Sequence, residues 1–204
     1  MRPPRILPIT PGSTTDPGLP GLLDDLRRLR SGGGEGVLIR EPLLSDKASL
    51  ELCLFARALF VDGWVGVNDR VHVGLASGVD AVHLGYKSLS PSSVQAIAAG
   101  QISVGHSHHA PELLMAEMVA DYRFIGPVFP TPSKEGLVEP MGLSALNDLP
   151  MASRTWAVGG IGPEEALAVL SSGVAGLACI RSVFGVGDPE EGIARMLEAV
   201  ACHA

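Results

Sequence analysis

The chain has 204 residues, a formal net charge of −7, 46% apolar residues and only 4% aromatic residues. This length fits one domain of ordinary size or a compact α/β barrel. The negative charge and the lack of clustered Lys and Arg argue against a nucleic-acid partner, because phosphate backbones require such clusters. With so few aromatic side chains, we expect Val, Leu, Ile and Ala to build the core, as in buried parallel sheets.

Short apolar runs recur along the chain, and each is followed by a turn signal and then by a helical pattern. The runs predict strands at 6–10, 36–40, 64–68, 81–84, 102–106, 122–125, 155–158 and 176–180. Amphipathic spacing, proline near the start and acidic first turns predict helices between them. These helices are expected at 19–30, 45–60, 90–100, 110–120, 162–173 and 188–200.

The alternation of strands and helices predicts a parallel sheet, and eight units predict a closed (β/α)8 TIM barrel. We expect one domain over residues 1–204, since no linker or low-complexity segment interrupts the chain. An open, doubly wound sheet is the alternative fold. It rarely needs eight units, and no GxGxxG motif opens the first helix.

The cysteines and the apolar runs indicate the cellular compartment in which the protein is expected. Cys53, Cys179 and Cys202 are widely spaced and form no disulfide or CxxC pattern, so we expect a reducing, cytoplasmic environment. Cys179 lies in an apolar run and is expected in the core. No apolar run approaches the ~20 residues of a membrane helix, and no signal peptide is predicted at the start. For the oligomeric state, both a monomer and a homo-oligomer are kept as alternatives.

Polar or glycine-rich groups follow nearly every predicted strand, where the chemistry of such barrels is found. After the sixth to eighth strands these groups suit a phosphate, because glycine amides, helix starts, hydroxyls and a lysine all bind anions. Prolines stiffen the loop GPVFPTPSKEG at 126–136. The residues expected to hold the phosphate are Thr131, Ser133, Lys134, Gly159, Gly160, Arg181 and Ser182.

The motif HSHH at 106–109 raises two alternatives. His106 and His108 would share one face of a strand, and with His83 or Asp69 they could bind zinc in a hydrolase. The other alternative is that strand-end histidines donate hydrogen bonds or act as an acid and base. His72, which follows the third strand, is expected to be structural.

Five segments in order resemble the thiamine phosphate synthase and TenI superfamily, whose fold is a (β/α)8 barrel. They read VNDRVHVGLASGVDAVHLGYKSLS, SVGHSHHAPE, DYRFIGPVFPTPSKEG, AVGGIGPEEA and ACIRSVFGVGDP. The resemblance implies that the phosphate-binding residues named above hold a thiazole phosphate, and that Lys134 contacts a diphosphate. Arg181 departs from the pattern, since the family usually has a small hydroxyl residue there.

The resemblance also shows where the pyrimidine-diphosphate half of the family's site is altered. Arg40 and Asn68 remain, and Asp69 matches one magnesium ligand. Three positions differ: Leu38 stands for the pyrimidine-binding Gln, Pro42 for a diphosphate-binding Lys, and Ser88 for the second acidic ligand. Lys87 lies beside Ser88. We therefore expect weak coupling of pyrimidine to thiazole, with no cofactor, and Mg²⁺ only in a synthase.

These losses favour a TenI-like thiazole tautomerase, an isomerase that shifts a proton on a small phosphorylated thiazole. Pro127 stands where the characterised tautomerase has its catalytic His. Another group must then move the proton, and we expect His106, with His83 and His109 as alternatives. A thiamine phosphate synthase with an altered diphosphate and magnesium site, and a non-catalytic protein that binds thiazole or thiamine phosphates, are the other hypotheses.

Overall fold

The computed structural model describes residues 2–109, 119–132, 136, 138–147 and 149–201. Its strands form a single eight-stranded parallel sheet in the order β1-β8-β7-β6-β5-β4-β3-β2. The strands are β1 (Ile6–Pro8), β2 (Gly36–Ile39), β3 (Trp64–Asn68), β4 (Ala81–Leu84), β5 (Ser103–His108), β6 (Tyr122–Ile125), β7 (Thr155–Val158) and β8 (Gly176–Cys179). The predicted fold class, a (β/α)8 barrel, is confirmed.

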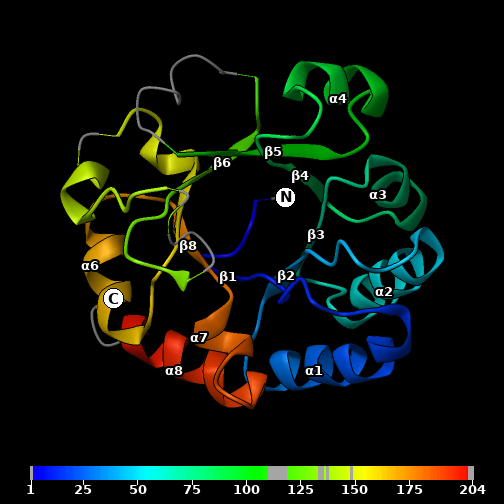
Figure 1. Cartoon of the computed structure of the whole chain (residues 1–204), viewed down its shortest axis with the longest axis horizontal. Coiled ribbons are helices and arrows are strands. Elements are labelled where there is room, and N and C mark those ends of the chain that lie inside the picture. The colour runs from blue at the N-terminus through cyan, green and yellow to red at the C-terminus, as the bar shows by residue number, and fades with distance from the viewer. Residues whose placement is uncertain (1, 110–118, 133–135, 137, 148, 202–204) are drawn as a thin grey trace.

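Contacts between β1 and β2 close the sheet into a barrel. Ile9 and Leu38 form a parallel bridge, and the Thr10 amide donates to the Leu38 carbonyl at 3.0 Å. The Thr10 hydroxyl then accepts from the Arg40 amide at 2.8 Å, so its side chain completes the ladder past the end of β2. Figure 1 shows the resulting ring of strands with the helices around it.

The helices cover the outside of the barrel. They are α1 (Leu19–Ser31), α2 (Asp46–Leu59), α3 (Val71–Ser77), α4 (Pro91–Ala98), α6 (Pro163–Ser171), α7 (Arg181–Phe184) and α8 (Pro189–Ala201). Ser45 and Ser90 cap α2 and α4, since each side chain accepts an amide of the first turn. The helix expected at 110–120 lies almost entirely outside the described residues. No helix within the described part of the chain is long and apolar enough to cross a membrane.

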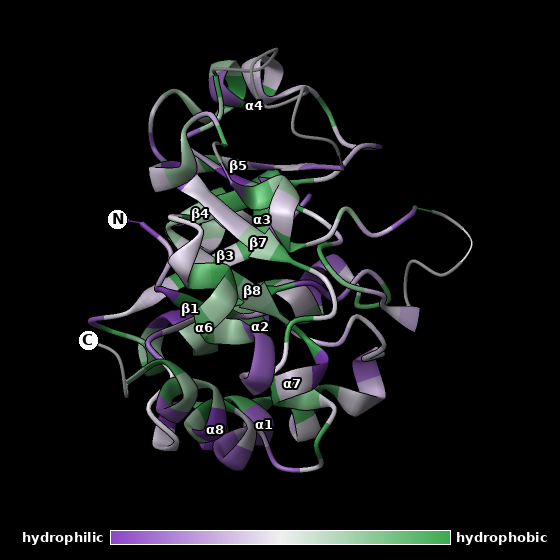
Figure 2. Cartoon of the chain, turned by 90° about the vertical axis from the view of Figure 1, so that its left-hand side faces the viewer, coloured by the Kyte–Doolittle hydropathy of each residue, from purple (hydrophilic) through white to green (hydrophobic). Residues whose placement is uncertain are grey.

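Two apolar layers hold the barrel together. The larger one is mostly aliphatic and lies between strands and helices; Figure 2 shows the apolar colour concentrated on the central strands. The smaller one fills the barrel and contains Leu7, Ile9, Leu38, Trp64, Ala81, Tyr122, Phe124, Trp156 and Ala178. The expectation of an aliphatic core is therefore wrong for the barrel interior, where four large aromatic side chains pack.

Glycines in the strands make room for these rings. A Cβ atom on Gly105 would lie 2.2 Å from the Tyr122 ring, and one on Gly66 would lie 2.4 Å from Trp64. The rings therefore occupy volume that glycines leave free, on the neighbouring strand for Tyr122 and on the same strand for Trp64. Cys179 is buried, as expected, and burial raises the pKa of its thiol to about 12.

Candidate active site at the carboxyl ends of the strands

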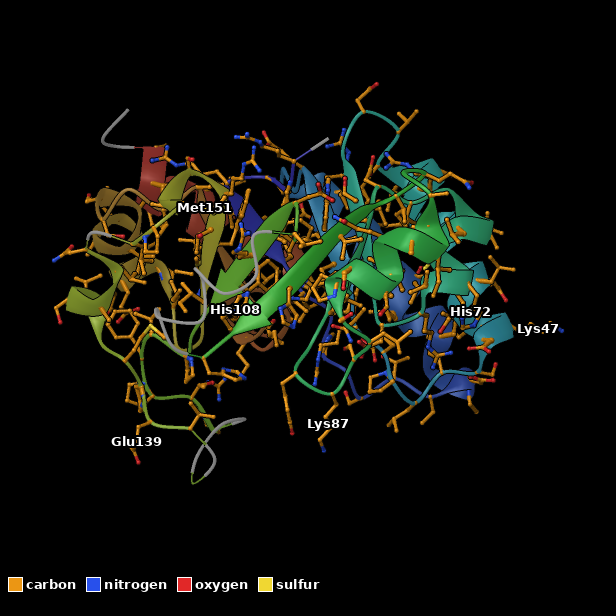
Figure 3. All side chains as sticks on the ribbon, turned by 90° about the horizontal axis from the view of Figure 1, so that it is seen from above. Lys47, His72, Lys87, His108, Glu139 and Met151 are labelled. Atoms are coloured by element: carbon orange, nitrogen blue, oxygen red, sulfur yellow. The ribbon has the colours of Figure 1, made fainter. Side chains whose placement is uncertain are left out.

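The carboxyl ends of the strands open on the side of the barrel where Lys87 and Glu139 lie, at the lower edge of Figure 3. Met151, which precedes β7, lies toward the opposite end. At that opposite end the surface also has a hollow of about 690 Å³, lined by residues such as Asp80, Gln95 and Asp121. The predicted site residues do not line this hollow, so its size does not mark it as the active site.

The end of β2 ties the first loop to the barrel. Glu41 is 5% exposed and accepts hydrogen bonds from the amides of Gly12 and Thr14, at 2.9 and 2.8 Å. Its neighbour Arg40 is exposed and lies so close to Gly12 that a Cβ there would be 2.5 Å from Nη1. Among the described residues, the Arg40 side chain has no hydrogen bond or ion pair, which leaves its guanidinium for a ligand.

The ends of β3 and β4 meet through Asp69. One carboxylate oxygen accepts from the Asn68 amide group at 2.6 Å, and the other accepts from the Ser88 hydroxyl. Asp69 has a φ of 60°, a left-handed conformation that Asp tolerates better than most residues. The residue expected as a magnesium ligand is thus held by two neighbouring side chains.

The interior of the barrel holds His83, which is 2% exposed. Its Nε2 lies 2.8 Å from the Ser107 hydroxyl and its Nδ1 lies 3.3 Å from the Tyr122 hydroxyl. The imidazole also stacks on Phe124 at a centroid distance of 3.9 Å. Burial, followed by the charges of His106 and His108, lowers the pKa of His83 to about 3. The ring is therefore neutral at physiological pH.

This pKa predicts how stability depends on pH. The unfolded chain protonates His83 near pH 6.5 and the folded chain does not, so stability is retained above pH 6.5 and lost as pH falls toward 3. Between pH 6.5 and 5 the loss is about 2 kcal/mol, at 1.4 kcal/mol per unit. Urea unfolding at pH 8 and pH 5 should show this slope in wild type and in His72→Gln, an exposed control. The slope should be smaller in His83→Gln.

His106, the favoured acid–base candidate, lies on the outer face of β5. This strand runs to His108, beyond the expected end at His106. Its Ser107 side chain reaches His83 inside the barrel, so His106 and His108 lie on the outer face, with ring centroids 4.7 Å apart. His106 therefore does not face the barrel interior. The zinc alternative is not supported, because His83 lies on the other side of the sheet.

His109 has the most suitable position of the three histidines for contact with a ligand. Its Nδ1 lies 2.7 Å from the Gly126 carbonyl oxygen, which can only accept, so Nδ1 carries the proton. Nε2 is then the basic nitrogen. The ring is half-buried beside Tyr86, at a centroid distance of 6.3 Å. His109 is thus oriented by the loop that follows β6.

The predicted phosphate site combines the loops after β6, β7 and β8. Past the end of β6, the amides of Val128 and Phe129 donate to the carbonyls of Val158 and Gly159, both at 3.0 Å. Arg181 donates to the Thr131 hydroxyl at 2.7 Å, which links the loop after β8 with the loop after β6. The structure thus brings together Thr131, Gly159, Gly160, Arg181 and Ser182, while Ser133 and Lys134 lie outside the described residues.

Close packing explains the glycine pair after β7. Gly159 and Gly160 have φ values of 99° and 68°, which favour glycine. A Cβ on Gly159 would lie 2.6 Å from the Pro127 Cα, and one on Gly160 would lie 2.7 Å from the Pro130 carbonyl oxygen. The Ser182 hydroxyl donates its proton to the carbonyl of Ile161, the residue after the glycine pair, at 2.8 Å.

Two hydrogen bonds of the site were not predicted from the sequence: that between Ser107 and His83, and that between Arg181 and Thr131. Alternation along β5 could have indicated the first, because Gly105 and Ser107 occupy the same face as the interior residues of β6. The second joins loops 50 residues apart, and no local pattern marks it.

Known proteins resemble this chain over most of its length. Residues 8–183 match the family model described as thiamine monophosphate synthase. The thiamine-phosphate synthase of Laribacter hongkongensis is 36% identical over 92% of this chain and 93% of its own length. That of Archaeoglobus fulgidus is 34% identical over 82% of this chain and 81% of its own.

A solved structure is also similar. Thiamine phosphate pyrophosphorylase from Pyrococcus furiosus has a TM-score of 0.82 and 29% sequence identity, over 96% of this chain and 95% of that one. The two relatives are named as synthases and the solved structure as a pyrophosphorylase, so they do not support the expected tautomerase branch. With the family match, they establish that this chain is a thiamine-biosynthesis enzyme of the thiamine phosphate synthase and TenI superfamily.

Proposed function

We propose that this protein is a transferase that joins a pyrimidine diphosphate to a thiazole phosphate, with release of diphosphate. The observation that carries the proposal is the division of the mouth into two groups. Arg40 follows β2, and Asn68 and Asp69 lie at the end of β3. Thr131 and Arg181 follow β6 and β8. In the sheet order these groups lie on separate arcs of the ring. Each group contains an arginine that can bind a phosphate, and two such groups suit two phosphorylated substrates, whereas an isomerase needs only one.

Each group has a distinct task in this reaction. The group after β6 to β8 would hold the thiazole phosphate with hydroxyl, amide and guanidinium donors. Arg40 would bind the diphosphate, on which negative charge increases as it leaves. The His83 ring would position the Ser107 hydroxyl at the mouth. Because the ring is buried and neutral, it is unsuited to proton exchange with solvent.

The test is coupling by the purified protein, followed as thiamine phosphate formed and diphosphate released. Arg40→Met should lower kcat/KM about ten- to a hundredfold, the effect of losing one charge-assisted contact. Arg154→Met is a matched control, because Arg154 is exposed at the opposite end of the barrel, before β7. Equal effects of both substitutions, or the absence of any coupling, would contradict the proposal.

A second candidate is the isomerase reaction, and the geometry of His109 favours it. The bond from Nδ1 to the Gly126 carbonyl leaves Nε2 as a base on the side of the mouth where the thiazole phosphate is expected. If His109 moves the proton, the wild type isomerises the thiazole carboxylate phosphate and His109→Gln loses about 10²–10⁴ in rate. His106→Gln should then keep full activity, since His106 lies on the outer face of β5.

A further inference from the structure

The turn between β4 and α4 closes over the carboxylate of Asp69. The Ser88 hydroxyl accepts from the Gly85 amide at 2.7 Å and donates its only proton to an Asp69 oxygen. The other Asp69 oxygen accepts from the Asn68 side chain at 2.6 Å. The Asp69 amide donates to the His83 carbonyl at 3.0 Å, which fixes the residue against β4. Both carboxylate oxygens therefore already have partners within the protein.

This arrangement does not fit the divalent cation that the family implies. Mg²⁺ prefers octahedral oxygen coordination and is usually held by one or two carboxylates together with substrate phosphates. Here Ser88 occupies the position of the second carboxylate, and its proton already bonds the first. Within the part of the chain that the structure describes, no three His, Cys, Asp or Glu residues form a group that could hold a metal ion.

The same turn contains a cationic side chain, that of Lys87. Lys87 is exposed at the end of the barrel that holds the mouth, as Figure 3 shows. Its Nζ lies 5.4 Å from the ring centroid of Tyr86, and it has no ion pair with any described residue. Arg40 follows β2, two strands away in the sheet order. Together the two side chains have the charge of one divalent cation, and both can donate hydrogen bonds to phosphate oxygens.

We propose that Lys87, assisted by Arg40, neutralises the diphosphate of the substrate in place of a divalent metal, so that diphosphate binds this mouth without Mg²⁺. The proposal rests on the proposed transferase function for the identity of the anion. Ser88 supports it in two ways, because its hydroxyl satisfies Asp69 and adds no negative charge that would repel the diphosphate.

The first experiment measures binding of inorganic diphosphate by calorimetry, in EDTA and in Mg²⁺. Wild type should bind with similar Kd in both, within about threefold. In EDTA, Lys87→Met should weaken binding about tenfold or more, the loss expected for one charge-assisted contact. Lys47→Met is the control, because Lys47 is also exposed but lies on α2, far from Lys87 in Figure 3. Wild-type binding that requires Mg²⁺, or equal losses in both variants, would overturn the proposal.

The second experiment restores the missing carboxylate with Ser88→Asp. This variant should bind Mn²⁺, detected by electron paramagnetic resonance, and should bind diphosphate in a metal-dependent way. Wild type should bind Mn²⁺ at least tenfold more weakly, and tight wild-type binding would contradict the proposal. Coupling that EDTA abolishes would refute the role of Lys87 but leave the transferase intact. Diphosphate binding that depends on Lys87 without any coupling would support that role and refute the transferase.

Discussion

Replacing Pro42 with Lys and Ser88 with Asp is expected to raise the rate of coupling about 10²-fold or more in the presence of Mg²⁺. Each replacement restores a charged group that the resemblance places on the diphosphate or its metal. One charge-assisted contact contributes about 1.5–3 kcal/mol, or roughly ten- to a hundredfold. Pro42 is exposed, and its carbonyl accepts from Arg70 at 3.3 Å, a bond that a lysine backbone retains.

The measurement is kcat/KM for thiamine phosphate formation, with Mg²⁺ and with EDTA. In EDTA the gain should disappear, because the carboxylate introduced by Ser88→Asp would face Asp69 without a cation between them. Ser153→Asp, at an exposed position before β7, serves as the control for an added negative charge. A double variant no faster than wild type with Mg²⁺ would show that these two positions do not limit coupling.

Leu38 is left unchanged in this variant for a structural reason. It is 1% exposed and belongs to the cluster that fills the barrel. A glutamine there would bury an amide among apolar side chains, which costs about 1–3 kcal/mol without a partner. The loss of the pyrimidine-binding residue is therefore linked to the packing of the barrel, whereas the other two departures lie at its mouth.

The strands could be predicted from the sequence because apolar runs bounded by Gly, Pro and polar residues persist in all eight. Two strands differ by two residues at their ends: β1 stops at Pro8 instead of Thr10, and β5 continues to His108 past its predicted end at His106. The difference at β5 affects the site. The polar residues at the end of β5 do not look like a strand in the sequence, yet they pair regularly with β6. His106 pairs with Arg123, and His108 pairs with Ile125. Neighbouring strands supply those hydrogen bonds, so tertiary pairing overrides the polar pattern.

The candidate site was predictable only in part, because strand ends are local features and side-chain directions are not. The positions of Arg40, Asn68 and Gly159 at the mouth follow from the strand pattern alone. The outward face of His106 depends on which residues of β5 face the interior, and the pairing of β5 with β6 fixes that. The ends of the strands could therefore be predicted, whereas the face of β5 on which His106 lies could not, and the catalytic role of the histidines stays a prediction.

Gly160→Ala is expected to lower the stability of the protein and to weaken phosphate binding. Gly78→Ala is the control that separates backbone strain from overpacking. Both glycines have left-handed φ, 68° and 67°, so alanine at either costs about 1–2 kcal/mol of backbone strain. Nothing lies within 4 Å of a Cβ on Gly78, whereas one on Gly160 would lie 2.7 Å from both the Phe129 Cβ and the Pro130 carbonyl oxygen. Overpacking of this kind adds about 1–3 kcal/mol.

The contact at Gly160 joins the loops after β6 and β7, so relief of the overlap must separate them. Urea unfolding should show a loss of about 2–5 kcal/mol for Gly160→Ala, which sums strain and overpacking, and about 1–2 kcal/mol for Gly78→Ala. The Kd for thiazole phosphate should rise at least tenfold only in Gly160→Ala, because separated loops cannot direct Thr131 and the glycine amides at one anion. Unchanged binding in a folded Gly160→Ala protein would place the phosphate elsewhere in the mouth.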